Sequence, residues 1–457
     1  MPLWRKQASW TDDMSVKELP KGLWWLAFLA VAGGIIIGII GAAFRWALQE
    51  GAQARINLVE WAHQWPIMGF FIPVLAACVC VVIARYITRL VPEASGSGVQ
   101  RVEGAMRNEI PLEAGRVVPA KFAGGLLAIS AGLALGREGP TVQMGASVGS
   151  RLGKSGRIGK GGQEEMEASL AGAGLAVAFN APLGSTIFVF EELTRSFKLR
   201  LLITALLGTS TAVVVSRLIL GNIPEFQLGA INPPDFWSHV GYGVFGLLVG
   251  VMGAWYNKTV ISLLNLFQKV KKYPEIPAAI VGAVVGGIAY FYPTQVGGGE
   301  NIAQAMFTDT PVLWVIVVLL IFRWILGPVS YAVGTPGGLF SPLLALGALM
   351  GALFATVLNL VPFIDLSVTG FAFVGMSAFF AGVVRAPLTG IVIATEMAAT
   401  TALMIPSLMA GAGAMMGATF AKVEPIYDTL RRRAPDYRPA KTQQGSGRSE
   451  PHQGGTQ

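Results

Sequence analysis

Long apolar runs recur along most of this chain and restrict the class of fold that it can form. Only 13% of its 457 residues are charged, compared with about 25% in an ordinary soluble domain. A run needs roughly 20 apolar residues to cross about 30 Å of hydrocarbon, and eight runs reach or approach that length. The sequence therefore predicts a polytopic membrane protein. The runs are Leu23–Leu48, Pro66–Ile87, Leu201–Leu220, Val240–Trp255, Ile276–Phe291, Val312–Val333, Leu343–Val361 and Ala402–Phe420.

The charged residues are placed unevenly. The formal net charge is +8, and basic residues concentrate in short loops and near the chain ends, for example Arg5, Lys6 and Arg431 to Arg433. This distribution is typical of a positive-inside bias rather than of nucleic-acid binding. We therefore expect both termini in the cytoplasm, with residues 1–20 as a cytoplasmic segment and residues 431–457 as a basic, disordered tail. The short tail favours a bacterial inner-membrane location.

Two pairs of segments resemble each other at a nearly constant offset. The glycines and proline of "GREGPTVQMGASVG" recur in "GGLFSPLLALGALMG", with Gly136 matching Gly338. Further on, "APLGSTIFVFE" at Ala181 matches "APLTGIVIATE" at Ala386. We infer two related halves, about 21–220 and 240–427, whose relative orientation the sequence leaves open. In transporters with repeats of this kind, the substrate binds where broken helices of both halves meet.

Three glycine-rich stretches each precede an apolar helical pattern. They are "ASGSGVQRVEG", "GREGPTVQMG" and "GTPGGLFSPLL". Glycines permit a sharp turn, and a proline in the first helical turn suits a helix start. A helix that begins there presents unpaired amide hydrogens and about half a positive charge, which together can bind an anion. The alternative is that these glycines serve only in packing.

Taken together, "GSGVQRVEG", "GREGP" and "GGLFSP" resemble the three selectivity stretches of the CLC family of chloride channels and proton-coupled chloride transporters. The resemblance covers about residues 22–430 and includes "EPIYDTL" near the C-terminus. It implies an all-α fold, built as an inverted repeat of tilted and discontinuous helices. It also implies a homodimer with one pore in each subunit.

The same resemblance implies which groups bind the anion. Ser97 and Tyr427 would give hydroxyl donors to a central anion. The backbone amides of Leu339 and Phe340 would complete that site. Considered without the family, Tyr427 would be a tyrosine at the membrane interface.

Arg137, Glu138 and Gly139 fall on an outer anion site of the family. A carboxylate beside amide donors can occupy such a site in place of an anion, and it must leave once it is protonated. Glu138 is therefore predicted to be both gate and external proton acceptor. Burial disfavours its charged form while the amides favour it. The alternative is an Arg137–Glu138 ion pair with no transport role, but charges at membrane depth are costly and tend to be functional.

A second acid bears on the choice between exchanger and channel. The family's internal proton acceptor falls on Glu192, in "FVFEELTRSF". Exchangers of the family carry an acid here, and those of its channels that lack the acid conduct passively. The sequence therefore favours a proton-coupled chloride antiporter, with a passive gated chloride channel as the alternative. Glu192 and its neighbour Glu191 could instead be solvated charges at a helix end.

A few further positions match the family less decisively. Glu103 and Lys121 resemble charges near its proton route, and each could equally belong to a structural ion pair. Arg116 could be an interfacial anchor. Gln100 stands where the family usually has proline, whereas Ser97 is kept, as expected for chloride rather than nitrate or fluoride.

No enzymatic set is recognisable in the sequence. A membrane-embedded hydrolase would need a nucleophile with a base or a metal. Cys78 and Cys80 lie two residues apart in an apolar run and would point to different faces of a helix. The three histidines lie far apart in the chain. We therefore predict no enzymatic activity, no metal and no cofactor. The expected partners are chloride, protons, the lipid bilayer and a second copy of the chain.

Overall fold

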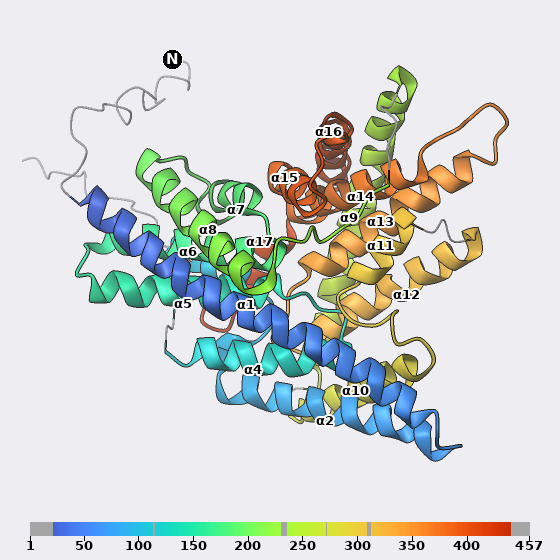
Figure 1. Cartoon of the computed structure of the whole chain (residues 1–457), viewed down its shortest axis with the longest axis horizontal. Coiled ribbons are helices and arrows are strands. Elements are labelled where there is room, and N and C mark those ends of the chain that lie inside the picture. The colour runs from blue at the N-terminus through green and yellow to red at the C-terminus, as the bar shows by residue number, and fades with distance from the viewer. Residues whose placement is uncertain (1–21, 113–114, 230–234, 271, 309–311, 440–457) are drawn as a thin grey trace, which may run out of the picture.

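The computed structural model describes residues 22–112, 115–229, 235–270, 272–308 and 312–439, and the predicted N-terminal segment 1–20 lies outside them. Every regular element in the described ranges is a helix (Figure 1). The predicted all-α fold is confirmed. The elements are α1 (Leu23–Ala62), α2 (Met68–Leu90), η1 (Pro92–Ala94), α3 (Val99–Met106), α4 (Val117–Ser130), α5 (Glu138–Ser155), α6 (Lys160–Phe179), α7 (Pro182–Phe188), η2 (Val189–Thr194), α8 (Leu199–Leu220), α9 (Phe236–Gln268), α10 (Glu275–Phe291), α11 (Glu300–Thr308), α12 (Leu313–Ala332), α13 (Phe340–Leu358), α14 (Val368–Val384), α15 (Pro387–Met397), α16 (Met404–Phe420) and α17 (Ile426–Arg432).

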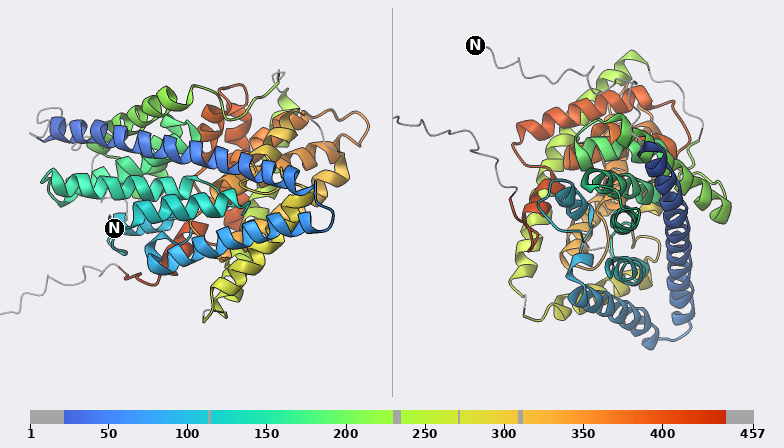
Figure 2. Two further views of the ribbon diagram at one scale, coloured as in Figure 1. Left: turned by 60° about the horizontal axis from the view of Figure 1, so that its bottom comes forward. Right: turned by 90° about the vertical axis from the view of Figure 1, so that its left-hand side faces the viewer.

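The helices differ widely in length. Six of them, α1, α2, α8, α9, α12 and α13, are long and apolar enough to cross a membrane. The apolar runs at Ile276–Phe291 and Ala402–Phe420 form α10 and α16, of 17 residues each, or about 26 Å at the α-helical rise. The longest helix, α1, runs along the outside of the bundle in both views of Figure 2. Long and shorter helices therefore occur together, as the predicted fold of discontinuous helices requires.

The packing of the first half is repeated in the second. Helix α1 packs on α8 as α9 packs on α16, and α5 packs on α6 as α13 packs on α14. Gly149 of α5 and Gly351 of α13 occupy matching positions in these pairs. A Cβ on Gly149 would meet the carbonyl oxygen of Met166, and one on Gly351 would meet that of Phe371. Glycine is therefore needed at both positions for the helices to approach so closely.

The ends of α7 and α15 show that the two halves are related by a two-fold axis. Glu191 accepts a hydrogen bond from the Thr389 amide at the start of α15, at 2.7 Å. Its repeat partner Glu396 accepts one from the Gly184 amide at the start of α7, at 2.8 Å. Each half thus supplies an acid that caps a helix of the other half, where the helix dipole favours a negative charge.

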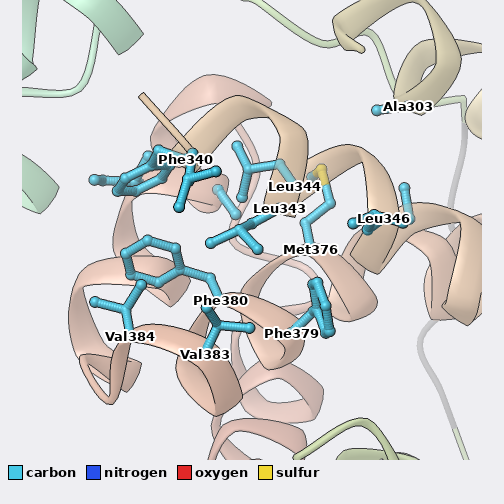
Figure 3. Close-up of a cluster of buried hydrophobic side chains, with 14 of the residues drawn as sticks. Ala303, Phe340, Leu343, Leu344, Leu346, Met376, Phe379, Phe380, Val383 and Val384 are labelled. Atoms are coloured by element: carbon cyan, nitrogen blue, oxygen red, sulfur yellow. The ribbon is translucent and has the colours of Figure 1, made fainter. Parts of the chain in front are cut away.

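The start of α13 lies inside the main apolar core. Figure 3 shows side chains of α13 and α14 packed together, among them Phe340 and Phe380. Their ring centroids are 4.1 Å apart. On the other side Phe340 packs against Phe179 of α6, at 4.7 Å between centroids. Aromatic contacts on both sides fix where α13 begins and where its first amides point.

The C-terminal boundary differs from the sequence prediction. Arg431 was expected to open a disordered tail, but it lies in α17 and only 3% of its side chain is exposed. Asp436 then pairs with Arg101 at 2.9 Å, and the amide of Arg438 donates to the carbonyl of Glu109. The described chain is therefore packed through residue 439. Ion pairs with distant segments, which local composition does not reveal, hold it there.

Candidate anion and proton site

The three glycine-rich stretches converge on one place in the fold. Gly136 and Gly338 form an antiparallel bridge, with N to O distances of 2.9 and 2.8 Å. Gly96 bridges Pro336 in parallel. Because Gly136 and Gly338 are also repeat partners, their mutual pairing is what a two-fold axis through this point requires. The two loops run in opposite directions there, so the repeat is inverted, as predicted.

Three helices begin at this meeting point. Helix α3 begins at Val99, α5 at Glu138 and α13 at Phe340. Their N-cap residues, which include Leu339, make no side-chain capping hydrogen bond. The first amide groups of α5 and α13 are thus available to an acceptor from elsewhere.

Glu138 supplies such an acceptor. Its side chain is fully buried. Its Oε1 accepts from the Ser341 amide at 3.1 Å, and its Oε2 accepts from the Ser341 hydroxyl at 3.2 Å. The carboxylate therefore occupies the start of α13. The predicted donors Leu339 and Phe340 directly precede Ser341, which the sequence analysis missed although "GGLFSP" displays it.

Two hydroxyl groups lie beside this carboxylate. Ser97 and Tyr427 are both fully buried. Neither Ser97 Oγ nor Tyr427 Oη has a hydrogen-bond partner among the described residues. Tyr427 is close enough to interact electrostatically with both Glu138 and Glu192. Because buried hydroxyls are normally paired, these two groups are candidate donors to a ligand at this site.

The loop that carries Ser97 is held from two sides. Lys121 of α4 is fully buried, and its Nζ donates to the carbonyls of Gly96 and Ser97 at 2.7 and 3.1 Å. Within the described part of the chain, Lys121 forms these two hydrogen bonds and no ion pair. On the other side, Gly139 at the start of α5 lies so close that a Cβ on it would meet Ser97. The predicted site residue Gly139 thus lets α5 approach the serine.

Gln100 stabilises the same loop through its side chain. Its Oε1 accepts from the Gly98 amide at 3.2 Å, and its Nε2 donates to the Tyr331 hydroxyl at 3.4 Å. Gly98 has a φ of 95°, a left-handed conformation that suits glycine. Hydrogen bonds therefore restrain the turn at the position where the family usually has proline.

Arg137 pairs with an acid other than Glu138. Its Nε donates to the Ala178 carbonyl at 2.9 Å, and its guanidinium pairs with Glu225 in the loop after α8. Glu225 also pairs with Arg45 of α1 at 2.9 Å. Burial acts to raise the pKa of Glu225, but the two arginines outweigh it and leave that pKa below its ordinary value. The sequence analysis missed both Arg45 and Glu225, which lie far from "GREGP" in the chain.

A cavity with polar lining groups adjoins the triad formed by Arg45, Arg137 and Glu225. It has a volume of about 230 Å³, and its lining includes Arg137, Glu225, Gln49, Glu300 and Asn301. Arg137 directly precedes Glu138 in the chain. The cavity therefore offers polar surroundings and room for water beside the start of α5.

Glu192, the second predicted acid, is almost fully buried, at 1% exposure. Its Oε2 is 3.7 Å from Arg195, and its Oε1 has no hydrogen-bond partner among the described residues. It is therefore not a solvated charge at a helix end. Beside it, Glu103 pairs with Arg431 and Arg195, and Asp428 pairs with the same two arginines at 2.7 and 3.0 Å. Glu103 thus belongs to an ion network, whereas Glu192 stands at its edge.

The remaining positions have simpler surroundings. Arg116 is the exposed N-cap residue of α4. Among the described residues, no group of three or more His, Cys, Asp or Glu side chains could hold a metal ion.

Fold and site together define a class of protein. The chain is a helical membrane protein with an inverted repeat, and its broken helices meet at a buried polar site, as in secondary transporters. The profile described as voltage gated chloride channel matches residues 80–419. This chain belongs to that family, and the resemblance inferred from the sequence is confirmed.

Characterised relatives match over most of their length. The H(+)/Cl(-) exchange transporter ClcA of Klebsiella pneumoniae subsp. pneumoniae is 33% identical over 420 residues, which are 89% of this chain and 88% of the relative. The protein of the same name from Vibrio vulnificus (strain YJ016) is 34% identical over 420 residues, 89% of each chain. The crystal structure of a slow cyanobacterial Cl-/H+ antiporter superposes with a TM-score of 0.85 at 30% identity, covering 89% of this chain and 97% of that one.

Proposed function

We propose that this chain is a proton-coupled chloride antiporter, a transporter rather than an enzyme. The relatives named for H(+)/Cl(-) exchange support this substrate pair. One observation carries the proposal for the site. The buried Glu138 carboxylate occupies the start of α13, in the region that also contains two buried hydroxyls without a partner among the described residues.

The order of events follows from this arrangement. While Glu138 is charged, its oxygens occupy donors that an anion would otherwise use. Protonation removes the charge and weakens these charge-assisted bonds, so the side chain leaves and an anion takes its place. Ser97, Tyr427 and the amides of Leu339 and Phe340 would then bind chloride on its way through.

Protons need a second acceptor on the opposite side of the anion site. Glu192 is buried, its Oε1 has no hydrogen-bond partner among the described residues, and it is near enough to Tyr427 to interact with it electrostatically. We propose that Glu192 exchanges protons with the inner solution and that Glu138 exchanges them with the outer one. Arg195 near Glu192 stabilises the charged form between transfers.

Reconstitution into liposomes tests this function. A chloride gradient should drive protons uphill in the unsubstituted protein. In Glu138→Gln the neutral amide mimics the protonated gate, so chloride flux should persist while proton coupling is lost. Glu60→Gln, an exposed acid on α1, is the matched control and should behave like the parent. Chloride flux without proton movement in the parent would establish the passive channel instead, and no flux of either ion would reject the proposal.

We also propose that the protein is a homodimer in a bacterial inner membrane, with one pore in each subunit and both termini in the cytoplasm. One pore in each subunit requires that Ser97, Glu138, Glu192 and Tyr427 of the same chain act together. Mixed dimers of parent and Glu138→Gln subunits test this. Independent pores predict that half of the proton coupling remains, whereas a shared pore predicts none.

A further inference from the structure

Ser341 is the residue that receives the gate in this structure. It is the second residue of α13 and is 3% exposed. Its amide donates to Glu138 Oε1 at 3.1 Å, and its hydroxyl donates to Glu138 Oε2 at 3.2 Å. A single residue thus binds both oxygens of the carboxylate.

The two donors differ in what they require of the sequence. Any residue but proline would supply the amide, because it belongs to the backbone. The second donor depends on the side chain, and serine supplies it through its hydroxyl. A donor bound to a charged acceptor favours the charged form of Glu138 over the neutral form.

The same hydroxyl remains in place when the gate leaves. The start of α13 is packed between Phe179 and Phe380 through Phe340, so the Ser341 amide is fixed relative to the site and the hydroxyl can move only by rotation about the Cα–Cβ bond. An anion that enters where the carboxylate was meets the same amide and the same hydroxyl.

We propose that the Ser341 hydroxyl is a shared ligand, which binds the charged gate in the closed state and the transported chloride after the gate has left. This inference rests on the proposed function and adds a residue to it. Ser341 is thus expected to influence two properties: the pH at which the gate opens, and the affinity and selectivity for the anion.

The charges around Glu138 define the setting for the pH effect. Glu138 interacts with Arg137 at the start of its own helix, with Glu300 of α11 and with Tyr427 of α17. Replacing Ser341 changes none of these groups. A change in pH dependence on removal of the hydroxyl therefore reports on the Ser341–Glu138 bond itself.

The decisive experiment measures anion binding with the gate removed. In a Glu138→Ala background, calorimetry with chloride should show affinity about tenfold or more weaker after Ser341→Ala, the loss expected for one hydrogen bond to an ion. Ser341→Thr keeps the hydroxyl and should stay within about threefold of the background. Ser377→Ala is the matched control, because Ser377 is fully buried and its hydroxyl bonds only the Val374 carbonyl of its own helix.

A second measurement uses the intact gate. With Glu138 present, Ser341→Ala should move the external pH of half-maximal chloride transport upward by about one unit. If the charged carboxylate of Glu138 is bound tenfold more weakly, it is protonated at a lower proton concentration. Ser377→Ala should leave this pH unchanged. Ser341→Cys, a weaker donor of similar size, provides the same comparison if the alanine variant is not recovered folded.

The outcomes separate the two claims. If the Glu138→Ala background binds chloride and Ser341→Ala binds it equally well, the hydroxyl is not an anion ligand and this inference alone is wrong. If Ser341→Ala weakens chloride binding but does not move the pH of half-maximal transport, the claim that the Ser341 hydroxyl stabilises the charged Glu138 gate is wrong. If the background binds no halide at all, the proposed function fails and this inference fails with it.

Discussion

Glu225 offers the sharpest test of how the start of α5 is held. Its carboxylate lies between Arg45 of α1 and Arg137 of the "GREGP" loop, and the three side chains are only 10 to 13% exposed. Without the acid, each guanidinium keeps one backbone acceptor. These are the Val177 carbonyl for Arg45 at 3.3 Å and the Ala178 carbonyl for Arg137 at 2.9 Å.

Glu225→Gln keeps the shape of the side chain and removes its charge. Two buried positive charges then face each other without an acid between them. Breaking a buried ion pair in this way costs about 3–5 kcal/mol. Because both arginines keep a carbonyl acceptor, we expect the lower end, about 3 kcal/mol, or roughly a hundredfold in the folding equilibrium.

The measurement is the loss of monodisperse protein on heating in detergent, followed by gel filtration. Glu60→Gln is the matched control, since replacing an exposed acid changes stability by no more than about 0.5 kcal/mol. In Arg45→Met/Glu225→Gln one positive charge is also removed, so the double variant should lose less stability than the sum of the single losses. Equal melting of Glu225→Gln and Glu60→Gln would refute the reasoning.

The pH dependence of stability gives an independent check of the triad. The pKa of Glu225 lies below its ordinary value of 4.5. A lowered pKa in the folded state means that the acid contributes its full stabilisation above about pH 4.5 and loses it as the pH falls through the lower folded value. The parent should therefore lose stability on acidification below pH 4.5 more steeply than Glu225→Gln. Parallel acid profiles for the two proteins would contradict this.

Three further predictions concern the proton acceptor, the anion and the helix caps. Glu192→Gln should abolish proton flux in liposomes while chloride flux continues. The control Glu191→Gln should keep both fluxes. Retained proton flux in Glu192→Gln would show that this residue is not on the proton route. Tyr427→Phe deletes one buried hydroxyl and should weaken chloride binding, measured by calorimetry, by about 0.5–3 kcal/mol. Unchanged affinity would place the tyrosine outside the anion site. Glu396→Gln removes the charged acceptor at the start of α7 and should lower thermal stability by about 0.5–2 kcal/mol, with no loss expected if the cap is only incidental.

The apolar runs, the repeat and the helix starts could be predicted from the sequence because each is local. Hydrophobic length and low charge determine which segments cross a membrane. Glycines followed by a proline in the first turn, as in "GREGP" and "GGLFSP", mark where a helix begins. For the same reason the family, the all-helical fold and the importance of Glu138 could be inferred before the structure was known.

The partners of these residues could not be predicted, because they lie far apart in the chain. Ser341 is 203 residues from Glu138, and Glu225 is 180 residues from Arg45. The reciprocal caps formed by Glu191 and Glu396 likewise exist only once the two halves are folded against each other. The sequence showed these acids at matching positions but not that each caps a helix of the opposite half.

Burial also determined the structural role of several charged residues. Glu191 and Glu192 are neighbours with the same chemistry, yet Glu191 caps α15, while Glu192 lies buried with one oxygen that has no hydrogen-bond partner in the described part of the chain. Arg431 resembled the start of a basic tail and is instead buried among acids. Sequence alone determined which residues carry charge and where helices begin. The tertiary structure decided which charges meet, because the cost of burying a charge depends on the groups that folding places beside it.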